Sequence, residues 1–292
     1  MIKRFIEYLE KLVRKVYTPH NSHNLFLRTI KRCYWEIKII IDPSIMKPDE
    51  NTVLFFTQNA KRVNAIINML SDEQSKKIYS SIVKFRQTHS KKDYPKSKQE
   101  HEYFFNGLKL SKDEVFIDCG AYIGDTIDEF LKRMPIEYKQ IVAFEPDSKN
   151  FKELKKRHGC NPKITLINAG AYDKEGELLF KEQGGSSRIT DEIDNEQNNI
   201  VHIQVRTIDN LELDNVSFIK MDIEGAELNV LKGAEKTILK NKPKLAICIY
   251  HSDEDMINIA EYINNLIPEY KLYVRHYSFY PSITDTVLYA LI

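Results

Sequence analysis

The sequence is poor in cysteine, in glycine and in long hydrophobic runs, and each shortage excludes a class of protein. Its four cysteines (Cys33, Cys119, Cys160 and Cys248) form neither the close pairs of a zinc site nor the dense set of a disulfide framework. Ten glycines and ten prolines in 292 residues exclude a collagen-like or low-complexity chain. No apolar run approaches the roughly 20 residues that span a bilayer, and the first residues lack the centre of a signal peptide. We therefore expect a cytoplasmic protein.

Net charge is also almost absent, which argues against a nucleic-acid partner. The chain carries 43 basic and 42 acidic side chains. This balance conceals an uneven distribution, because residues 1–100 hold 20 basic and 10 acidic side chains, whereas residues 101–292 hold 23 and 32. We therefore predict a helical N-terminal region over residues 1–100 and a second domain over residues 101–292.

The apolar spacing of the N-terminal region predicts helices. Residues 1–17 would form a basic amphipathic helix that could contact a membrane peripherally, although such a stripe more often packs on its own domain or on a partner chain. Residues 25–41 and 60–87 are also helical in pattern, with a capping turn at Ser71-Asp72 in the second. The lysine-rich residues 89–99 are interpreted as a linker or surface loop with a solvated charged face, and contact with an anionic ligand is the alternative. This region would serve acceptor recognition or assembly into a homo-oligomer.

From residue 114 onward, short apolar runs alternate with helical segments. The predicted strands cover residues 115–119, 141–145, 164–168, 218–222 and 245–250, and the predicted helices cover residues 125–133, 148–158, 226–239 and 253–266. Strands that are apolar on both faces and separated by helices are typical of a parallel sheet with helices on both sides. The sequence therefore predicts an α/β fold with a doubly wound, mostly parallel sheet.

Two departures refine this fold. Residues 177–181 and 201–207 are strand-like and flank a polar segment, which predicts a hairpin-like insertion with a mobile loop. Residues 271–277 and 286–292 are joined too closely for a crossover helix, so they must pair antiparallel. We expect the sheet to end in this antiparallel hairpin.

The first candidate site is the turn after the strand at residues 115–119, which contains Asp118, Gly120 and Gly124. Ligands of open α/β sheets bind beyond the carboxyl ends of the strands, where glycines let the backbone approach and a helix begins. Alone, this pattern also fits a tight turn without a ligand, and Tyr122 replaces the middle glycine of a dinucleotide fingerprint. Glu145, at the end of the next strand, is placed to accept hydrogen bonds from a ribose diol. Together the two features favour a nucleoside site.

Further acidic residues follow the strand at residues 218–222. Asp222 and Glu224 would face the same edge as Asp118 and Glu145. Four carboxylates at one edge are costly unless they meet hydroxyls, a cation or a cationic ligand. S-adenosylmethionine, with its sulfonium, ammonium and ribose groups, is such a ligand. For Glu227 we prefer the simpler interpretation of an acid that favours a helix start.

These residues lie in motifs that resemble the FkbM family of S-adenosylmethionine-dependent methyltransferases. The resemblance runs from about Asp113 to Ile292, through FIDCGAYIGDT, AFEP, RTIDNL, IKMDIEGAELNVLKGAE, PKLAICIYH, RHYS and TVLYA. It implies a seven-strand sheet and methyl transfer mostly to oxygen, on sugars, as in polysaccharide biosynthesis, or on secondary metabolites. Two departures are Tyr122, where many methyltransferases have glycine, and Thr284-Asp285, where a glutamate is expected.

The resemblance also implies a set of site residues. Asp118, Gly120 and Gly124 would line the methionine end of the cofactor, and Glu145 would hold the ribose. The candidate cofactor-binding residues are Asp118, Gly120, Ala121, Gly124, Asp125, Thr126, Glu145, Asp222 and Glu224.

The methyl acceptor, a small molecule or a glycan, would approach over Asp222, His251 and His276. A hydroxyl that attacks a sulfonium needs a base or a metal. His251 follows its strand at the carboxyl edge of the sheet, where it could serve as the base or as a metal ligand. His276, on a strand expected to run the other way, is the weaker candidate. Asp222 and His251 could also hold a divalent cation, but the sequence shows no third ligand. Aromatic side chains at 103–105 could stack on a sugar, although core packing is favoured.

Two other functions remain open. A nicotinamide-dependent oxidoreductase could use such a sheet, but the missing middle glycine and the terminal hairpin argue against it. A non-catalytic methyltransferase fold could instead serve assembly through the helical region, and the intact glycine turn and acids argue that cofactor binding, at least, is retained.

Overall fold

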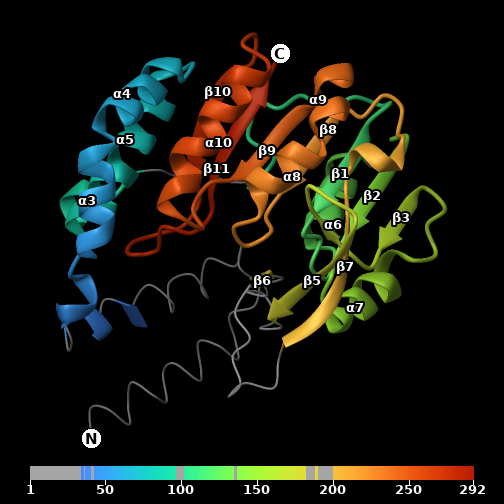
Figure 1. Cartoon of the computed structure of the whole chain (residues 1–292), viewed down its shortest axis with the longest axis horizontal. Coiled ribbons are helices and arrows are strands. Elements are labelled where there is room, and N and C mark those ends of the chain that lie inside the picture. Colours follow the sequence, from blue (N-terminus) through green and yellow to red (C-terminus); the bar gives the residue numbers. More distant parts are fainter. Residues whose placement is uncertain are drawn as a thin grey trace, which may run out of the picture.

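The computed structural model describes residues 34–35, 37–40, 43–96, 102–134, 137–181, 188–189 and 200–292 (Figure 1). The predicted amphipathic helix over residues 1–17 lies outside these residues, as does the end of the predicted linker. Within the described part of the chain, no helix is long and apolar enough to cross a membrane.

Three helices form a unit that precedes the main sheet in the chain: α3 (Glu50–Gln58), α4 (Ala60–Met69) and α5 (Glu73–Thr88). They follow a 3₁₀ turn, η2 (Pro43–Met46). Asp72 accepts a hydrogen bond from the backbone N–H of Ser75 and so caps α5. The predicted break at Ser71-Asp72 is confirmed.

The main sheet has seven strands, and only the last runs against the others. They are β1 (Val115–Cys119), β2 (Gln140–Phe144), β3 (Ile164–Ile167), β8 (Phe218–Met221), β9 (Lys244–Cys248), β10 (Lys271–His276) and β11 (Thr286–Leu291), in the order β10-β11-β9-β8-β1-β2-β3. The predicted fold class is therefore confirmed. One expectation is wrong: β11 lies antiparallel between β9 and β10, so β10 runs parallel to β9 and His276 ends at the same edge as Cys248.

A smaller sheet forms the predicted insertion. It contains β4 (Gly170–Ala171), β5 (Gly176–Lys181), β6 (Arg188–Ile189) and β7 (Ile200–Arg206), in the order β4-β7-β5-β6. The pairing of β5 with β7 is antiparallel and runs from Gly176 opposite Val205 to Lys181 opposite Ile200. The hairpin is thus confirmed, whereas most of its connecting loop lies outside the described residues.

Helices cover both faces of the main sheet because its strands alternate between two apolar clusters. One face packs against α8 (Glu227–Gly233), α9 (Glu235–Asn241), α10 (Asp253–Leu266) and the three N-terminal helices. The other face packs against α6 (Asp125–Arg133), α7 (Ser148–His158) and the aromatic residues Tyr103, Phe104 and Phe105. The predicted helix over residues 226–239 is thus two helices, which meet at Ala234.

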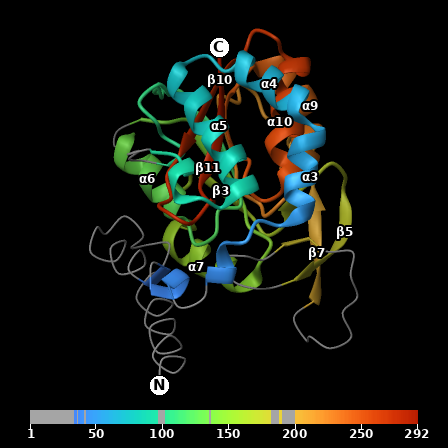
Figure 2. The ribbon, with the colours of Figure 1, turned by 90° about the vertical axis from the view of Figure 1, so that its left-hand side faces the viewer.

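The N-terminal helices also cover the edge strand β10, as Figure 2 shows from the side. The backbone N–H of Ser71 donates to the carbonyl of Leu272 at 2.8 Å, and that of Val274 donates to the Ser75 hydroxyl at 3.0 Å. Arg275 pairs with Asp72 at 2.7 Å. These contacts protect an edge that would otherwise be open to strand pairing, and the helices share one hydrophobic core with the sheet.

Candidate active site

The turn after β1 approaches the turn after β8 so closely that only glycine fits. Gly120 has a φ of +81°, and a Cβ built on it would lie 2.0 Å from the backbone oxygen of Asp222. Gly124, with a φ of +92°, begins α6. Asp125 and Thr126 form the first turn of that helix, and Ala121 is buried beside it. The turns after β1 and β8 can therefore pack this closely only because residue 120 is glycine.

Glu145 follows β2 at the same edge and is almost completely buried. Its Oε2 accepts a hydrogen bond from the backbone N–H of Tyr122 at 2.8 Å, and its Oε1 accepts one from Asp147 at 2.9 Å. Burial raises the pKa of Glu145 to about 7, against the opposing effect of these amides. Oε1 also accepts a hydrogen bond from Asn150 Nδ2 at 3.4 Å, so Oε2, with one partner and two lone pairs, is the oxygen that can accept a further hydroxyl.

Asp118 is fully buried and faces Lys220, a residue that the sequence analysis did not select. The Lys220 ammonium lies 3.1 Å from Asp118 Oδ1 and donates to the carbonyl of Gly120 at 2.7 Å. Burial alone would lower the pKa of Lys220, but Asp118 and Asp222 raise it well above its ordinary value. Lys220 thus stays charged and fastens the glycine turn. A lysine inside an otherwise apolar strand was the available sequence signal.

Asp222, after β8, accepts two tyrosine hydroxyls. Tyr103 donates to Oδ2 at 2.8 Å, and Tyr250 donates to Oδ1 at 3.0 Å. Burial would raise the pKa of Asp222, but Lys220, His251 and the hydroxyls hold it below its usual range. The group is therefore a carboxylate. Tyr103 was expected to pack in the core, and it contributes a hydrogen bond there as well.

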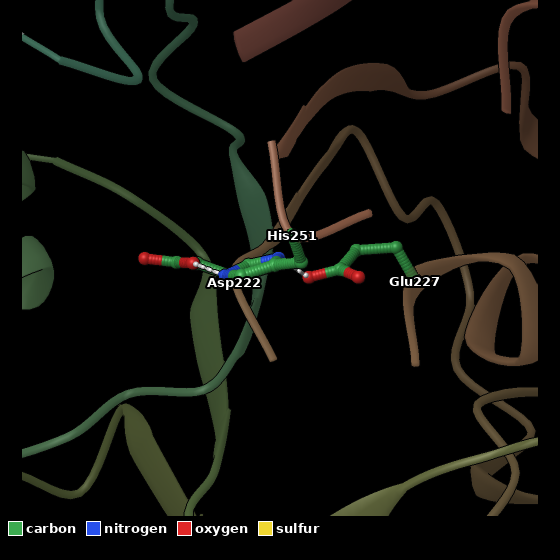
Figure 3. A group of neighbouring side chains, drawn as sticks. All are labelled: Asp222, Glu227 and His251. Carbon is green, nitrogen blue, oxygen red and sulfur yellow. Dashed lines mark ion pairs between the residues drawn. The ribbon is translucent and has the colours of Figure 1, made fainter. Parts of the chain in front are cut away.

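His251, after β9, lies between carboxylates (Figure 3). Its Nδ1 is 3.0 Å from Glu227 Oε1, and its Nε2 is 3.4 Å from Asp222 Oδ1 and 3.5 Å from Glu224 Oε2. The side chain is only 7% exposed. Burial alone would lower the pKa of His251, but the carboxylates, Glu227 foremost, raise it to about 9. The ring is therefore protonated at neutral pH.

Glu227 does more than favour a helix start, so that interpretation is corrected. Its side chain is fully buried, and its oxygens accept the backbone N–H groups of Ile223 at 2.9 Å and Gly225 at 3.0 Å. These bonds fix the carboxylate against His251 Nδ1. The arrangement is that of a histidine oriented by a buried acid, with its second nitrogen facing Asp222 and Glu224.

Asp222, Glu227 and His251 offer possible metal ligands within 4.8 Å of one another. Figure 3 shows the imidazole between the two carboxylates, and its nitrogens face opposite acids. A single ion could bind only one of these nitrogens, and the acid oxygens already accept N–H and O–H groups. This geometry suits a protonated ring between acids and does not form a metal cage.

The sequence profile of the methyltransferase FkbM domain matches residues 118–279, more than half of the chain. The chain belongs to the FkbM methyltransferase family. Over 183 residues it is 22% identical to the 2-O-methyltransferase NoeI of Sinorhizobium fredii (strain NBRC 101917 / NGR234), covering 55% of this chain and 73% of NoeI. The crystal structure of methyltransferase FkbM from Methylobacillus flagellatus KT is similar with a TM-score of 0.70 and 29% identity, over 82% of this chain. This chain spans 60% of that protein's length.

In this FkbM methyltransferase the third predicted catalytic residue, His276, forms hydrogen bonds with neither Asp222 nor His251. Its ring nitrogens bond to the Tyr94 hydroxyl at 2.7 Å and to the Thr286 hydroxyl at 2.9 Å. Burial lowers the pKa of His276 to about 3, so the ring is neutral. The structure thus brings His251, and not His276, into contact with Asp222.

The stretch interpreted as a linker or surface loop is in part docked on this FkbM domain. Asp93 is buried, and the Tyr94 hydroxyl donates to the carbonyl of Ser282 at 2.7 Å. The Lys91 ammonium lies 5.2 Å from the centre of the Tyr280 ring. Of the two interpretations, residues 91–94 fit the surface loop: Lys91 and Lys92 are exposed, and aromatic and hydrogen-bonding contacts that the local composition does not reveal dock the loop on the domain.

Proposed function

We propose that this FkbM methyltransferase transfers a methyl group from S-adenosylmethionine to a hydroxyl of a sugar or glycan. The observation that carries the proposal is the placement of His251 Nε2 beside Asp222 and Glu224, at the edge that also holds the glycine turn and Glu145. The similarity to NoeI, a 2-O-methyltransferase, supports the choice of oxygen as the acceptor atom.

The residues at the edge fit the cofactor. Gly120 lets the turn after β1 lie against Asp222, which brings the acids of the two turns to one place, and the buried Glu145 carboxylate retains acceptor capacity for a ribose hydroxyl. Asp222 and Glu224 supply negative charge for a sulfonium or an ammonium group. When bound, S-adenosylmethionine supplies an electrophilic methyl group.

His251 would act as the base. Its Nε2 would take the proton of the acceptor hydroxyl as the oxygen gains the methyl group, while Glu227 keeps Nδ1 oriented. Because the pKa of His251 is about 9, the neutral form is the minor one at neutral pH. We therefore expect turnover to rise with pH toward that value.

The charge of the edge favours a neutral, hydroxyl-rich acceptor. Asp222 and Glu224 border the His251 ring, and the Tyr250 hydroxyl lies beside them. A phosphate would meet carboxylate repulsion here, whereas sugar hydroxyls can donate to these oxygens.

Three further expectations stay predictions. They are membrane contact by residues 1–17, a homo-oligomeric state and a cytoplasmic location.

Mass spectrometry of neutral glycans, with nucleotide sugars as their anionic comparison, tests the proposal after incubation with the full chain and methyl-labelled S-adenosylmethionine. We expect one labelled methyl on an acceptor hydroxyl. His251→Ala should lose turnover while still binding S-adenosylhomocysteine, whereas His202→Ala, at a histidine 70% exposed on β7, should be fully active. Binding without transfer to any acceptor would favour the non-catalytic alternative.

A further inference from the structure

The N-terminal helix α5 reaches the turn that carries His251. Arg86, in its last turn, is 7% exposed. Its Nη2 donates to the carbonyl of Tyr250 at 2.6 Å, and its Nη1 donates to Asp253 Oδ1 at 2.6 Å. The carbonyl of Tyr250 belongs to the same planar peptide unit as the backbone nitrogen of His251. Arg86 therefore holds the main chain at the peptide bond that joins Tyr250 to His251.

Two further residues of the helical unit fasten the same turn. The Thr52 hydroxyl of α3 donates to Asp253 Oδ2 at 2.6 Å, so both oxygens of this carboxylate are bonded. The Tyr79 hydroxyl of α5 donates to the carbonyl of Met256 at 2.9 Å in a buried position. The turn between β9 and α10 is thus held from outside the residues that match the family profile.

Attachment of the helices to α10 does not by itself require Arg86. Arg62 on α4 already joins this unit to α10, through Glu261 at 2.5 and 2.9 Å and Asn258 at 2.8 Å. Arg62 is partly exposed, whereas Arg86 is buried at a desolvation cost that only close pairing offsets. The structure therefore places the costlier contact at the turn with His251.

We propose that Arg86 is a positioning residue that holds the backbone of His251, so that the helical unit forms part of the active site. This inference rests on the proposed function, in which His251 is the base. The groups that face His251 come from several elements: Asp222 and Glu224 after β8, Glu227 of α8, Asp255 of α10, and the adjoining Tyr250 ring at 4.0 Å. A shift of the turn would change the distance of the ring from all of them.

The test compares Arg86→Met with Arg62→Met in the full chain. Long-range ¹H–¹⁵N NMR would follow the ring nitrogens of His251, assigned by their loss in His251→Ala, through a pH titration without ligand. We expect Arg86→Met to move the midpoint below its wild-type value and Arg62→Met to leave it in place. In turnover, Arg86→Met should lower kcat about 10- to 100-fold, with the Kd of S-adenosylhomocysteine unchanged, and Arg86→Lys should recover part of that loss.

An Arg86→Met protein with the wild-type midpoint and kcat would overturn the proposal, as would an equal loss of kcat in Arg62→Met. If Arg86→Met does not fold, Asp253→Asn weakens the contact between Arg86 and the turn and should shift the midpoint in the same direction. An unshifted midpoint in Asp253→Asn then contradicts the proposal. Because the NMR titration needs no acceptor, failure of the proposed function shows separately, as full activity in His251→Ala.

Discussion

Replacement of Glu227 by glutamine tests most sharply how the His251 ring is held. Glutamine keeps the size of the side chain but removes the negative charge beside Nδ1. One oxygen becomes an NH₂ group, which cannot accept the backbone N–H of Ile223 or Gly225. The substitution thus removes the closest of the three carboxylates around the ring and one hydrogen bond to a part-buried backbone N–H group.

The pKa of His251 gives the magnitude. A rise from 6.5 to about 9 corresponds to ~3 kcal/mol in favour of the protonated ring. Glu227 is the largest contributor to this rise, so we expect its loss to lower the pKa by about one unit or more. The lost hydrogen bond should also cost about 0.5–1.5 kcal/mol of stability.

The assay is the pH profile of kcat/KM. In the wild type, kcat/KM should rise with pH with a midpoint near pH 9. In Glu227→Gln this midpoint should lie at lower pH. The maximal kcat/KM of the variant should also be lower, because the ring is less well oriented. The raised pKa also means that the protonated ring stabilises the fold fully below pH 6.5 and loses this effect as the pH rises through about 9. Denaturant unfolding of the variant should show less of this decline. A midpoint that stays near pH 9 in Glu227→Gln would refute the reasoning.

Three further predictions follow from the same edge of the sheet. Gly120→Ala should lose about 2 kcal/mol or more in denaturant unfolding, because its Cβ meets the Asp222 oxygen at a positive φ; Gly176→Ala, at a positive φ with nothing within 4 Å, should lose less, and equal losses would contradict the steric argument. Glu145→Gln should weaken S-adenosylhomocysteine binding about tenfold in calorimetry, and wild-type affinity should fall as the pH drops below about 7, where Glu145 gains a proton; a pH-independent affinity would argue against a ribose contact. EDTA should leave turnover unchanged, and activity restored only by added Mg²⁺ would reveal a metal that the geometry of His251 does not favour.

Much of the fold follows from local patterns. The helices at Asp125–Arg133, Ser148–His158 and Asp253–Leu266 have the predicted bounds, because their apolar spacing is local and a glycine or a capping side chain directly precedes each of them. The place of β11 between β9 and β10 could not be predicted in this way, since it depends on which edge the last strand joins. The split at Ala234 likewise interrupts an apolar pattern that continues through it.

In the site, too, some residues follow from local patterns and others depend on contacts between distant parts of the chain. Asp222, Glu145 and His251 follow parallel strands, so strand direction alone predicts that they share one edge. The contacts that Tyr103 and Arg86 make at the site could not be predicted from the sequence, because their partners are 119 and 164–167 positions away along the chain. The role of Glu227 was missed because its neighbouring glycine turn and its place at a helix start offered a simpler explanation.

The most direct test of the central claim is a crystal structure of the full chain with S-adenosylhomocysteine. The ribose hydroxyls should lie within hydrogen-bond distance of the Glu145 carboxylate, with the sulfur directed toward Asp222 and His251. A ribose bound away from Glu145, or no bound ligand at saturating concentration, would contradict the assignment of this edge as the methyl-transfer site.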